Sequence, residues 1–141
     1  MNTKVIKGRG VVSGIAEGEA LVTRQTISPW GGIDAMRGVI TERRHELNNI
    51  CFTGKILVFP SAKGSSGFST VAQVIRLAGT APAGMVIREM NSLTGMGCVI
   101  MRVPTITDLE EDPVEFIRTG DWLRIDGDLG RMEIIDRPKS V

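Results

Sequence analysis

The groups best suited to chemistry lie in residues 54–69, which read GKILVFPSAKGSSGFS. A continuous apolar run at 55–59 precedes a glycine- and serine-rich loop, and a helix is expected directly behind that loop. Unpaired backbone N–H groups and the positive end of the helix dipole favour an anion: a carboxylate, a phosphate or a deprotonated side chain. Lys63 adds a full positive charge. In this field Ser65 or Ser66 can act as a base, because that role requires a stabilised alkoxide.

A purely structural interpretation fits the same loop equally well. Ser66 would then cap the helix, Gly64 and Gly67 would supply turn geometry, and Lys63 would be solvated. A nucleotide-binding P-loop is disfavoured, because its glycine precedes the lysine, whereas Lys63 precedes Gly64 here. The residues alone leave the base site and the plain helix start both open.

Other candidate residues carry weaker patterns. His45 is the only histidine, and the charged run 41–46 around it is typical of a solvated surface. A single unplaced histidine does not support a Ser-His-Asp triad. Several arginines can grip a carboxylate, but nothing in their spacing selects one or defines a cluster. These arginines are Arg24, Arg43, Arg44 and Arg88.

The serine loop must be positioned by the elements on either side of it. Residues 55–59 are typical of a strand buried on both faces of a layered α/β domain. Apolar residues behind the loop recur at i, i+3, i+4 and i+7 and predict a helix that stops at Gly79. Residues 84–87 predict a second buried strand, which implies a right-handed crossover between parallel neighbours. The helical stripe consists of Val71, Val74, Ile75 and Ala78.

Shorter patterns outline the region before the serine loop and one strand after it. We predict early strands at 3–6, around Val11 and at 20–23, and a further short strand at 99–101. The proline and paired glycines of residues 28–34 predict an exposed loop.

The C-terminal part of the chain predicts a helix and a hairpin. Residues 112–113 supply an N-cap and a first-turn proline, and Gly120 is placed to end that short helix. Alternating residues at 123–125 and 132–134 predict two strands, and the sequence DGDLG at 126–130 suits the turn between them.

Composition indicates one ordinary folded domain. A chain of 141 residues suits a single core, so we predict one domain over 1–141 with frayed ends at 1–2 and 137–141. The 17 basic and 16 acidic residues are scattered and give a net charge of +1, which argues against nucleic acid or a membrane surface as a partner. Without an apolar signal region or a membrane-length run, the expected location is the cytoplasm.

The two cysteines, Cys51 and Cys98, lie far apart and outside any metal-ligand spacing. We interpret both as buried thiols. Two thiols cannot supply the four usual ligands of an iron–sulfur cluster, so we expect this chain to bind no metal by itself.

Six short motifs, in order along the chain, resemble the swivel-domain small subunit of the aconitase X family. Around the serine loop they are GKILVFP at 54–60, KGSS at 63–66 and GTAP at 79–82. Elsewhere they are GEALV at 18–22, WGGID at 30–34 and TGD at 119–121. The resemblance covers most of the chain.

The resemblance implies an α/β fold: a swivelling β/β/α domain with a mixed central sheet, a buried parallel strand-helix-strand unit and a C-terminal β-hairpin. It also implies docking onto a much larger subunit. Together the two chains of this family form a hydro-lyase, a dehydratase that removes water from a small hydroxy acid. An iron–sulfur cluster is held mainly by the large subunit.

Matching the motif residue by residue implies that Ser65, the first serine after Lys63 and Gly64, is the proton acceptor, with Ser66 as the competitor. We expect Lys63, Gly64, Ser66 and Gly67 to bind substrate or another anion. Elimination needs a base for the carbon-bound proton and a Lewis acid for the departing hydroxide. This chain offers the first and lacks the second, so we expect the isolated subunit to be inactive.

The resemblance implies two possible substrates, cis-3-hydroxy-L-proline in bacterial members and 5-phosphomevalonate in archaeal ones. Residues 43–47 look more like the bacterial side, and residues 61–62 replace two glycines of many relatives, which weakens the archaeal match. A phosphorylated substrate also needs a cluster of phosphate-binding residues, and none is visible. We therefore predict cis-3-hydroxy-L-proline. Phosphomevalonate dehydratase is the alternative, and a non-catalytic anion-binding or regulatory swivel domain is an alternative of another class.

Overall fold

The computed structural model describes residues 4–63 and 67–138, and most of its strands form one large mixed sheet. In sheet order the eight strands are β1 (Lys4–Lys7), β10 (Arg131–Asp136), β9 (Trp122–Asp126), β3 (Ile15–Val22), β6 (Ile56–Phe59), β7 (Gly84–Ile87), β8 (Thr105–Thr107) and β2 (Arg9–Val12). From β3 to β8 neighbouring strands are parallel, and the other pairs are antiparallel.

The long strand β3 belongs to two layers of this sheet. Its first part, from Ile15 to Glu19, pairs antiparallel with β9, whereas Ala20 to Val22 pair parallel with β6. Side chains of β1, β9 and β10 pack against those of β6, β7 and β8 in one apolar cluster. The sheet therefore folds back on itself, and its antiparallel part covers one face of its parallel part.

Alternate residues of β6 face two different cores. Ile56 and Val58 pack against the antiparallel layer, while Leu57 and Phe59 pack against the helices. All four residues are buried, which confirms the strand predicted from the continuous apolar run. The resulting three layers are the predicted β/β/α arrangement.

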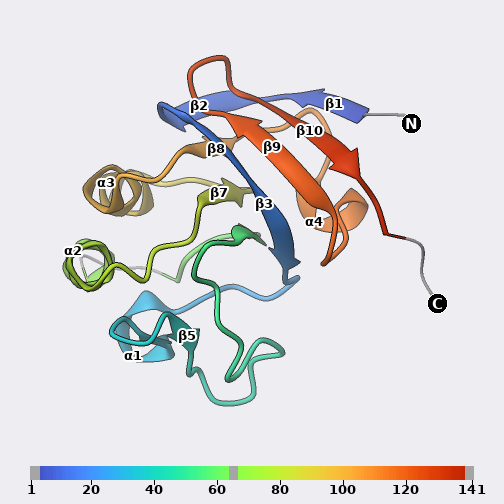
Figure 1. The fold of residues 1–141 in the computed structure, drawn as a ribbon. Helices are drawn as coiled ribbons and strands as arrows, with labels where there is room; N and C mark the ends of the chain where they lie inside the picture. The colour runs from blue at the N-terminus through green and yellow to red at the C-terminus, as the bar shows by residue number, and fades with distance from the viewer. Residues whose placement is uncertain (1–3, 64–66, 139–141) are drawn as a thin grey trace.

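The helices α1 (Pro29–Gly32), α2 (Gly67–Ala78) and α3 (Ser92–Met101) lie together on one side of the parallel strands (Figure 1). The predicted strand-helix-strand unit is confirmed, since α2 connects the parallel neighbours β6 and β7. Gly79 follows the helix at φ 73°, the left-handed conformation expected of a glycine after a helix end. The predicted stripe is wrong at Val74, which is 37% exposed. The buried residues of α2 are Phe68, Val71, Ala72 and Ile75.

The strand predicted at 99–101 is wrong, because these residues form the end of α3. A short apolar run suits a helix or a strand equally, so neighbouring signals decide. The side chain of Asn91 caps α3 by accepting the backbone N–H of Thr94 at 2.9 Å. The strand of this region is β8, later in the chain.

The exposed loop predicted at 28–34 is wrong in part. Pro29 is buried and begins the short helix α1, a position that its fixed φ suits. The chain continues into β4 (Ile33–Asp34), which pairs antiparallel with β5 (Val39–Ile40) in a small separate sheet.

The C-terminal elements follow the prediction with two differences. Asp112 caps α4 (Pro113–Phe116) as expected, but the helix ends well before Gly120. The hairpin of β9 and β10 is confirmed. Arg137, which we predicted to begin a frayed tail, donates to both carboxylate oxygens of buried Asp121 at 2.9 and 2.8 Å. A buried carboxylate needs such a partner, and this holds the chain past β10.

Within the described part of the chain, no helix combines the length and apolar character needed to cross a membrane.

Candidate functional site

The serine-rich loop follows the carboxyl end of β6. Its residues Gly64, Ser65 and Ser66, which carry the predicted base and part of the predicted anion site, lie outside the described residues. The described chain reaches Lys63, which is exposed and whose backbone N–H donates to the carbonyl of Ile27 at 2.8 Å. It resumes at Gly67, the first residue of the twelve-residue helix α2. The loop thus connects a buried strand to a helix N-terminus, as predicted.

The carboxyl ends of β3, β6 and β7 meet at one edge of the sheet. Beyond the strands, Ile27 and Ala62 form a parallel bridge, and the N–H of Glu89 donates to the carbonyl of Pro60 at 2.8 Å. Ligands of open α/β sheets bind outside the carboxyl ends of the parallel strands. This edge, which adjoins the serine loop, is therefore the candidate site.

An open depression of about 390 Å³ lies at this edge, and we call it the cationic depression. The expectation that the arginines form no cluster is wrong, since two of them line this depression together with Lys63. The adjacent arginines Arg43 and Arg44 were the signal in the sequence that could have indicated this cluster. The cluster could not be predicted, because the pair is far from Lys63 along the chain. The lining residues are Gln25, Thr26, Glu42, Arg43, Arg44 and Lys63.

The other two arginines considered from the sequence are already paired. Arg24 Nη2 lies 3.2 Å from Glu115 Oε2, and Arg88 Nη1 lies 3.2 Å from Asp112 Oδ2. Neither arginine lines the cationic depression. A ligand would have to break an ion pair to use either side chain.

His45 has a structural role. It is 5% exposed, which contradicts the solvated surface predicted for it. Its Nδ1 accepts the N–H of Leu47 at 3.0 Å, so the ring proton lies on Nε2, 3.1 Å from the carbonyl oxygen of Thr26. The ring therefore ties the segment that bears Arg43 and Arg44 to the segment after β3.

Motif residues outside the loop also hold the framework together. Oδ2 of Asp34 accepts a hydrogen bond from Nε of the Arg37 guanidinium at 2.7 Å, and this hydrogen bond lowers the pKa of the Asp34 carboxyl. Thr119 accepts the N–H of Val22 at 2.9 Å, just before Asp121 with its buried carboxylate. These residues fix the turn between β4 and β5 and the end of β3.

The cysteines do not fit a cluster site. Burial raises the pKa of the Cys98 thiol to about 12, which opposes the thiolate that a metal requires. Cys51 is exposed, so our prediction that it is buried is wrong. The described residues contain no group of three or more histidine, cysteine or acidic side chains that could hold a metal.

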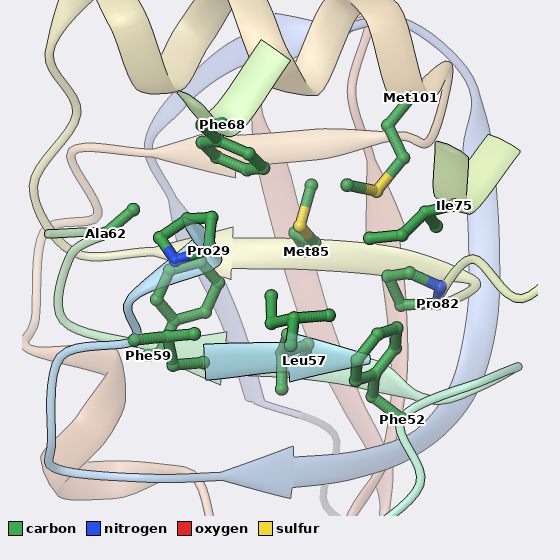
Figure 2. A pocket seen from close by; sticks show the side chains of 12 residues that line it. Pro29, Phe52, Leu57, Phe59, Ala62, Phe68, Ile75, Pro82, Met85 and Met101 are labelled. Carbon is green, nitrogen blue, oxygen red and sulfur yellow. The ribbon is translucent and has the colours of Figure 1, made fainter. Parts of the chain in front are cut away.

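A second cavity lies in the core between the sheet and the helices (Figure 2). Its volume is about 20 Å³, roughly that of one water, and every side chain lining it is apolar. Phe68 and Ile75 of α2 face Leu57 and Met85 of the sheet across it. The cavity has no polar group to orient a ligand, so we interpret it as a packing void.

This combination of a β/β/α domain and a strand-loop-helix site at the sheet edge has counterparts in known proteins. A family model described as the aconitase X swivel domain matches residues 5–134. The chain belongs to this family. The match extends from β1 to β10 and includes the serine loop, so the resemblance inferred from the short motifs is confirmed.

Individual relatives in the aconitase X family match almost end to end. The phosphomevalonate dehydratase small subunit of Pyrococcus furiosus is 36% identical over 130 residues, 92% of this chain and 95% of that protein. The phosphomevalonate dehydratase small subunit of Methanosarcina mazei is 36% identical over 129 residues, 92% of this chain and 90% of that protein. The crystal structure of Thermococcus kodakaraensis aconitase X in its holo-form has a TM-score of 0.89 at 33% identity, covering 94% of this chain and 99% of that chain.

These relatives establish the class of activity. The chain is the small subunit of an aconitase X-type dehydratase, a hydro-lyase. The names of the curated relatives favour the phosphomevalonate alternative over the cis-3-hydroxy-L-proline that we predicted.

Proposed function

We propose that this chain is the small subunit of a phosphomevalonate dehydratase. The choice of substrate rests on the cationic depression beside the serine loop, which is lined by Arg43, Arg44 and Lys63. A phosphate group needs several positive donors at once, and the prediction of hydroxyproline rested partly on their apparent absence. Relatives that match over nine-tenths of this chain bear the same name, which supports the proposal.

The reaction is the elimination of water from a 3-hydroxy acid. The carbon next to the carboxylate loses a proton, the neighbouring carbon loses its hydroxyl group, and a carbon–carbon double bond forms between them. We assign the proton to Ser65, with Ser66 as the alternate. A serine base requires a positive field, and the ammonium of Lys63 and the amino end of α2 support one at this loop.

The anion-binding groups that we propose around this base are the Lys63 side chain, the Ser66 hydroxyl and the backbone N–H groups of Gly64, Ser66 and Gly67. A loop that leads into a helix offers N–H donors of this kind. They would hold substrate charge close to the base.

A large partner subunit completes the proposed enzyme. The departing hydroxide needs an acid, and the cysteines of this chain do not fit an iron–sulfur site. We propose that the large subunit holds the iron–sulfur cluster. The existence of a large subunit is supported by the term small subunit in the relatives' names. On this proposal residues 1–141 form one swivel domain that is inactive by itself.

Co-expression with the gene of the proposed large subunit tests the proposal. The purified complex should convert 5-phosphomevalonate to its dehydrated product, followed by mass spectrometry as a loss of water, and should leave cis-3-hydroxy-L-proline unchanged. Ser65→Ala should lower kcat about 10²- to 10⁴-fold, the usual contribution of a general base. Ser66→Ala keeps the backbone N–H of that residue and should lower kcat less than Ser65→Ala does.

Each alternative has its own outcome in this experiment. Turnover of cis-3-hydroxy-L-proline instead would restore our first prediction. Full activity of Ser65→Ala would remove this serine from the mechanism. A stable complex that turns over neither compound would favour the non-catalytic anion-binding domain.

A further inference from the structure

The cationic depression contains more positive charge than the protein neutralises. Arg43, Arg44 and Lys63 form no ion pair with any other described residue, although all three line one depression. The carboxylate among the described lining residues is Glu42, and its Oε1 accepts the backbone N–H of Ser28 at 2.9 Å. The excess charge is therefore available to an anion from solution.

Arg44 occupies a position that its side chain does not favour. The N–H of His45 donates to the carbonyl of Glu42 at 3.2 Å, which closes a turn with Arg43 and Arg44 at its centre. Arg44 has φ 66°, in the left-handed region, where a turn of this kind prefers glycine or asparagine. Glycine would relieve this strain, so Arg44→Gly removes the guanidinium without weakening the turn.

Three separate segments hold the cations in a common frame. The ring of His45 joins the turn to the carbonyl of Thr26 at 3.1 Å, and the side chain of Gln25 accepts the N–H of Glu46 at 2.8 Å. On the other side, the N–H of Lys63 donates to the carbonyl of Ile27 at 2.8 Å. The segment after β3 thus binds both the arginine turn and the start of the serine loop, so the backbone that bears the three cations is held in place before any ligand arrives.

The reach of the chain relates this depression to the proposed base. Only Gly64 separates Lys63 from Ser65 in the sequence, so the stretch of chain that joins these two residues is at most about 7 Å long. Five bonds join the acidic carbon of 5-phosphomevalonate to its phosphorus, a comparable length. One substrate molecule can therefore reach both places.

We propose that Arg43, Arg44 and Lys63 form the subsite that holds the phosphate group of the substrate. The inference rests on the proposed function and extends it, because it assigns substrate selection to this chain. A guanidinium donates two parallel hydrogen bonds to phosphate oxygens, and the ammonium adds a third positive donor to the same group. The subsite discriminates phosphorylated from unphosphorylated hydroxy acids.

Two glycine substitutions in the co-expressed complex separate binding from folding. Arg44→Gly removes the cation and relieves the positive φ, so it should not lower the melting temperature. It should raise KM for 5-phosphomevalonate about 10- to 100-fold, the loss expected from charged hydrogen bonds, with kcat within about threefold. Arg102→Gly is the matched control, because Arg102 is exposed, has φ 61° and caps α3 away from the depression. It should leave both constants unchanged.

Inorganic phosphate provides a second readout that needs no turnover. Isothermal titration of the parent complex should detect phosphate binding, and Arg44→Gly should weaken it about tenfold or more while Arg102→Gly does not. Weakened phosphate binding without turnover of 5-phosphomevalonate would support the subsite and refute the proposed function. An active complex whose KM and phosphate affinity are unchanged in Arg44→Gly would overturn the subsite and leave the proposed function intact.

Discussion

The ring of Phe68 lies directly against the backbone of Gly97. A Cβ atom added at Gly97 would stand 2.9 Å from Cγ of that ring, closer than side-chain carbons approach each other. Phe68 is in the first turn of α2 and Gly97 is in the middle of α3. The absence of a side chain at Gly97 therefore lets α2 and α3 pack closely. This contact lies at the end of α2 that follows the serine loop.

Gly97→Ala should destabilise the protein although alanine is the better helix former. The added methyl group must displace a buried aromatic ring, which costs about 1–3 kcal/mol of the free energy of unfolding. Gly95→Ala is the matched control, because its nearest neighbour is the flexible Met90 side chain at 3.9 Å. That change should be neutral or stabilise by up to about 1 kcal/mol. Urea unfolding measures both, and equal effects would contradict the close-packing argument.

Asp121→Asn should weaken the C-terminal attachment. Asp121 is 1% exposed and accepts two hydrogen bonds from Arg137, and loss of its charge should cost about 1.5–3 kcal/mol of the free energy of unfolding. Asp108→Asn removes the same charge from an ion pair with Arg9, in which both side chains are more than half exposed. It should cost less than about 1 kcal/mol. Similar losses in the two variants would show that the burial of Asp121 is unimportant.

Glu46 should make stability depend on pH. Hydrogen bonds from the Thr23 hydroxyl and the Arg24 N–H lower the pKa of the Glu46 carboxyl below its usual 4.5. The folded state then binds its proton less readily than the unfolded state, so the stabilisation is present above pH 4.5 and is lost as the pH falls through the lowered pKa.

Urea unfolding at several pH values tests this dependence. The difference in free energy of unfolding between the parent and Glu46→Gln should be larger at neutral pH than in acid. Thr23→Val, which removes the main donor, should reduce the dependence. Parallel curves for the parent and Glu46→Gln would refute it.

The two thiols should react very differently with iodoacetamide. The thiolate is the nucleophile, and hydrogen bonds from Thr53 lower the pKa of exposed Cys51, whereas burial raises that of Cys98 to about 12. Mass spectrometry of the native chain should show one adduct, at Cys51, and a second only after unfolding. Thr53→Ala should shift the reaction at Cys51 to higher pH, and Cys51→Ser should leave no native adduct. Rapid alkylation of Cys98 in the native chain would contradict its burial.

Local patterns were sufficient for the elements that flank the serine loop. The apolar run at 55–59 predicts a doubly buried strand because both of its faces must be covered, and it is β6. Asp112 and Pro113 predict a helix start because capping depends on adjacent residues, and α4 begins there. Residues 99–101 were assigned wrongly, since a short apolar run does not reveal whether its neighbours are helical.

The sequence motifs were enough to assign the family, because their residue types and their order can be read directly from the sequence. The motifs could not predict that Arg43 and Arg44 lie in one depression with Lys63. The two segments are connected only through hydrogen bonds to the backbone of residues 26–27, which are far from both in sequence. Nor could the motifs separate Arg43 and Arg44, which lack an ion pair within the described chain, from Arg24, which has one with Glu115. Such long-range pairing leaves no periodic pattern in the sequence. Arg43, Arg44 and Lys63 therefore come to line one depression only in the tertiary structure, in which β3 and β6 pair in parallel.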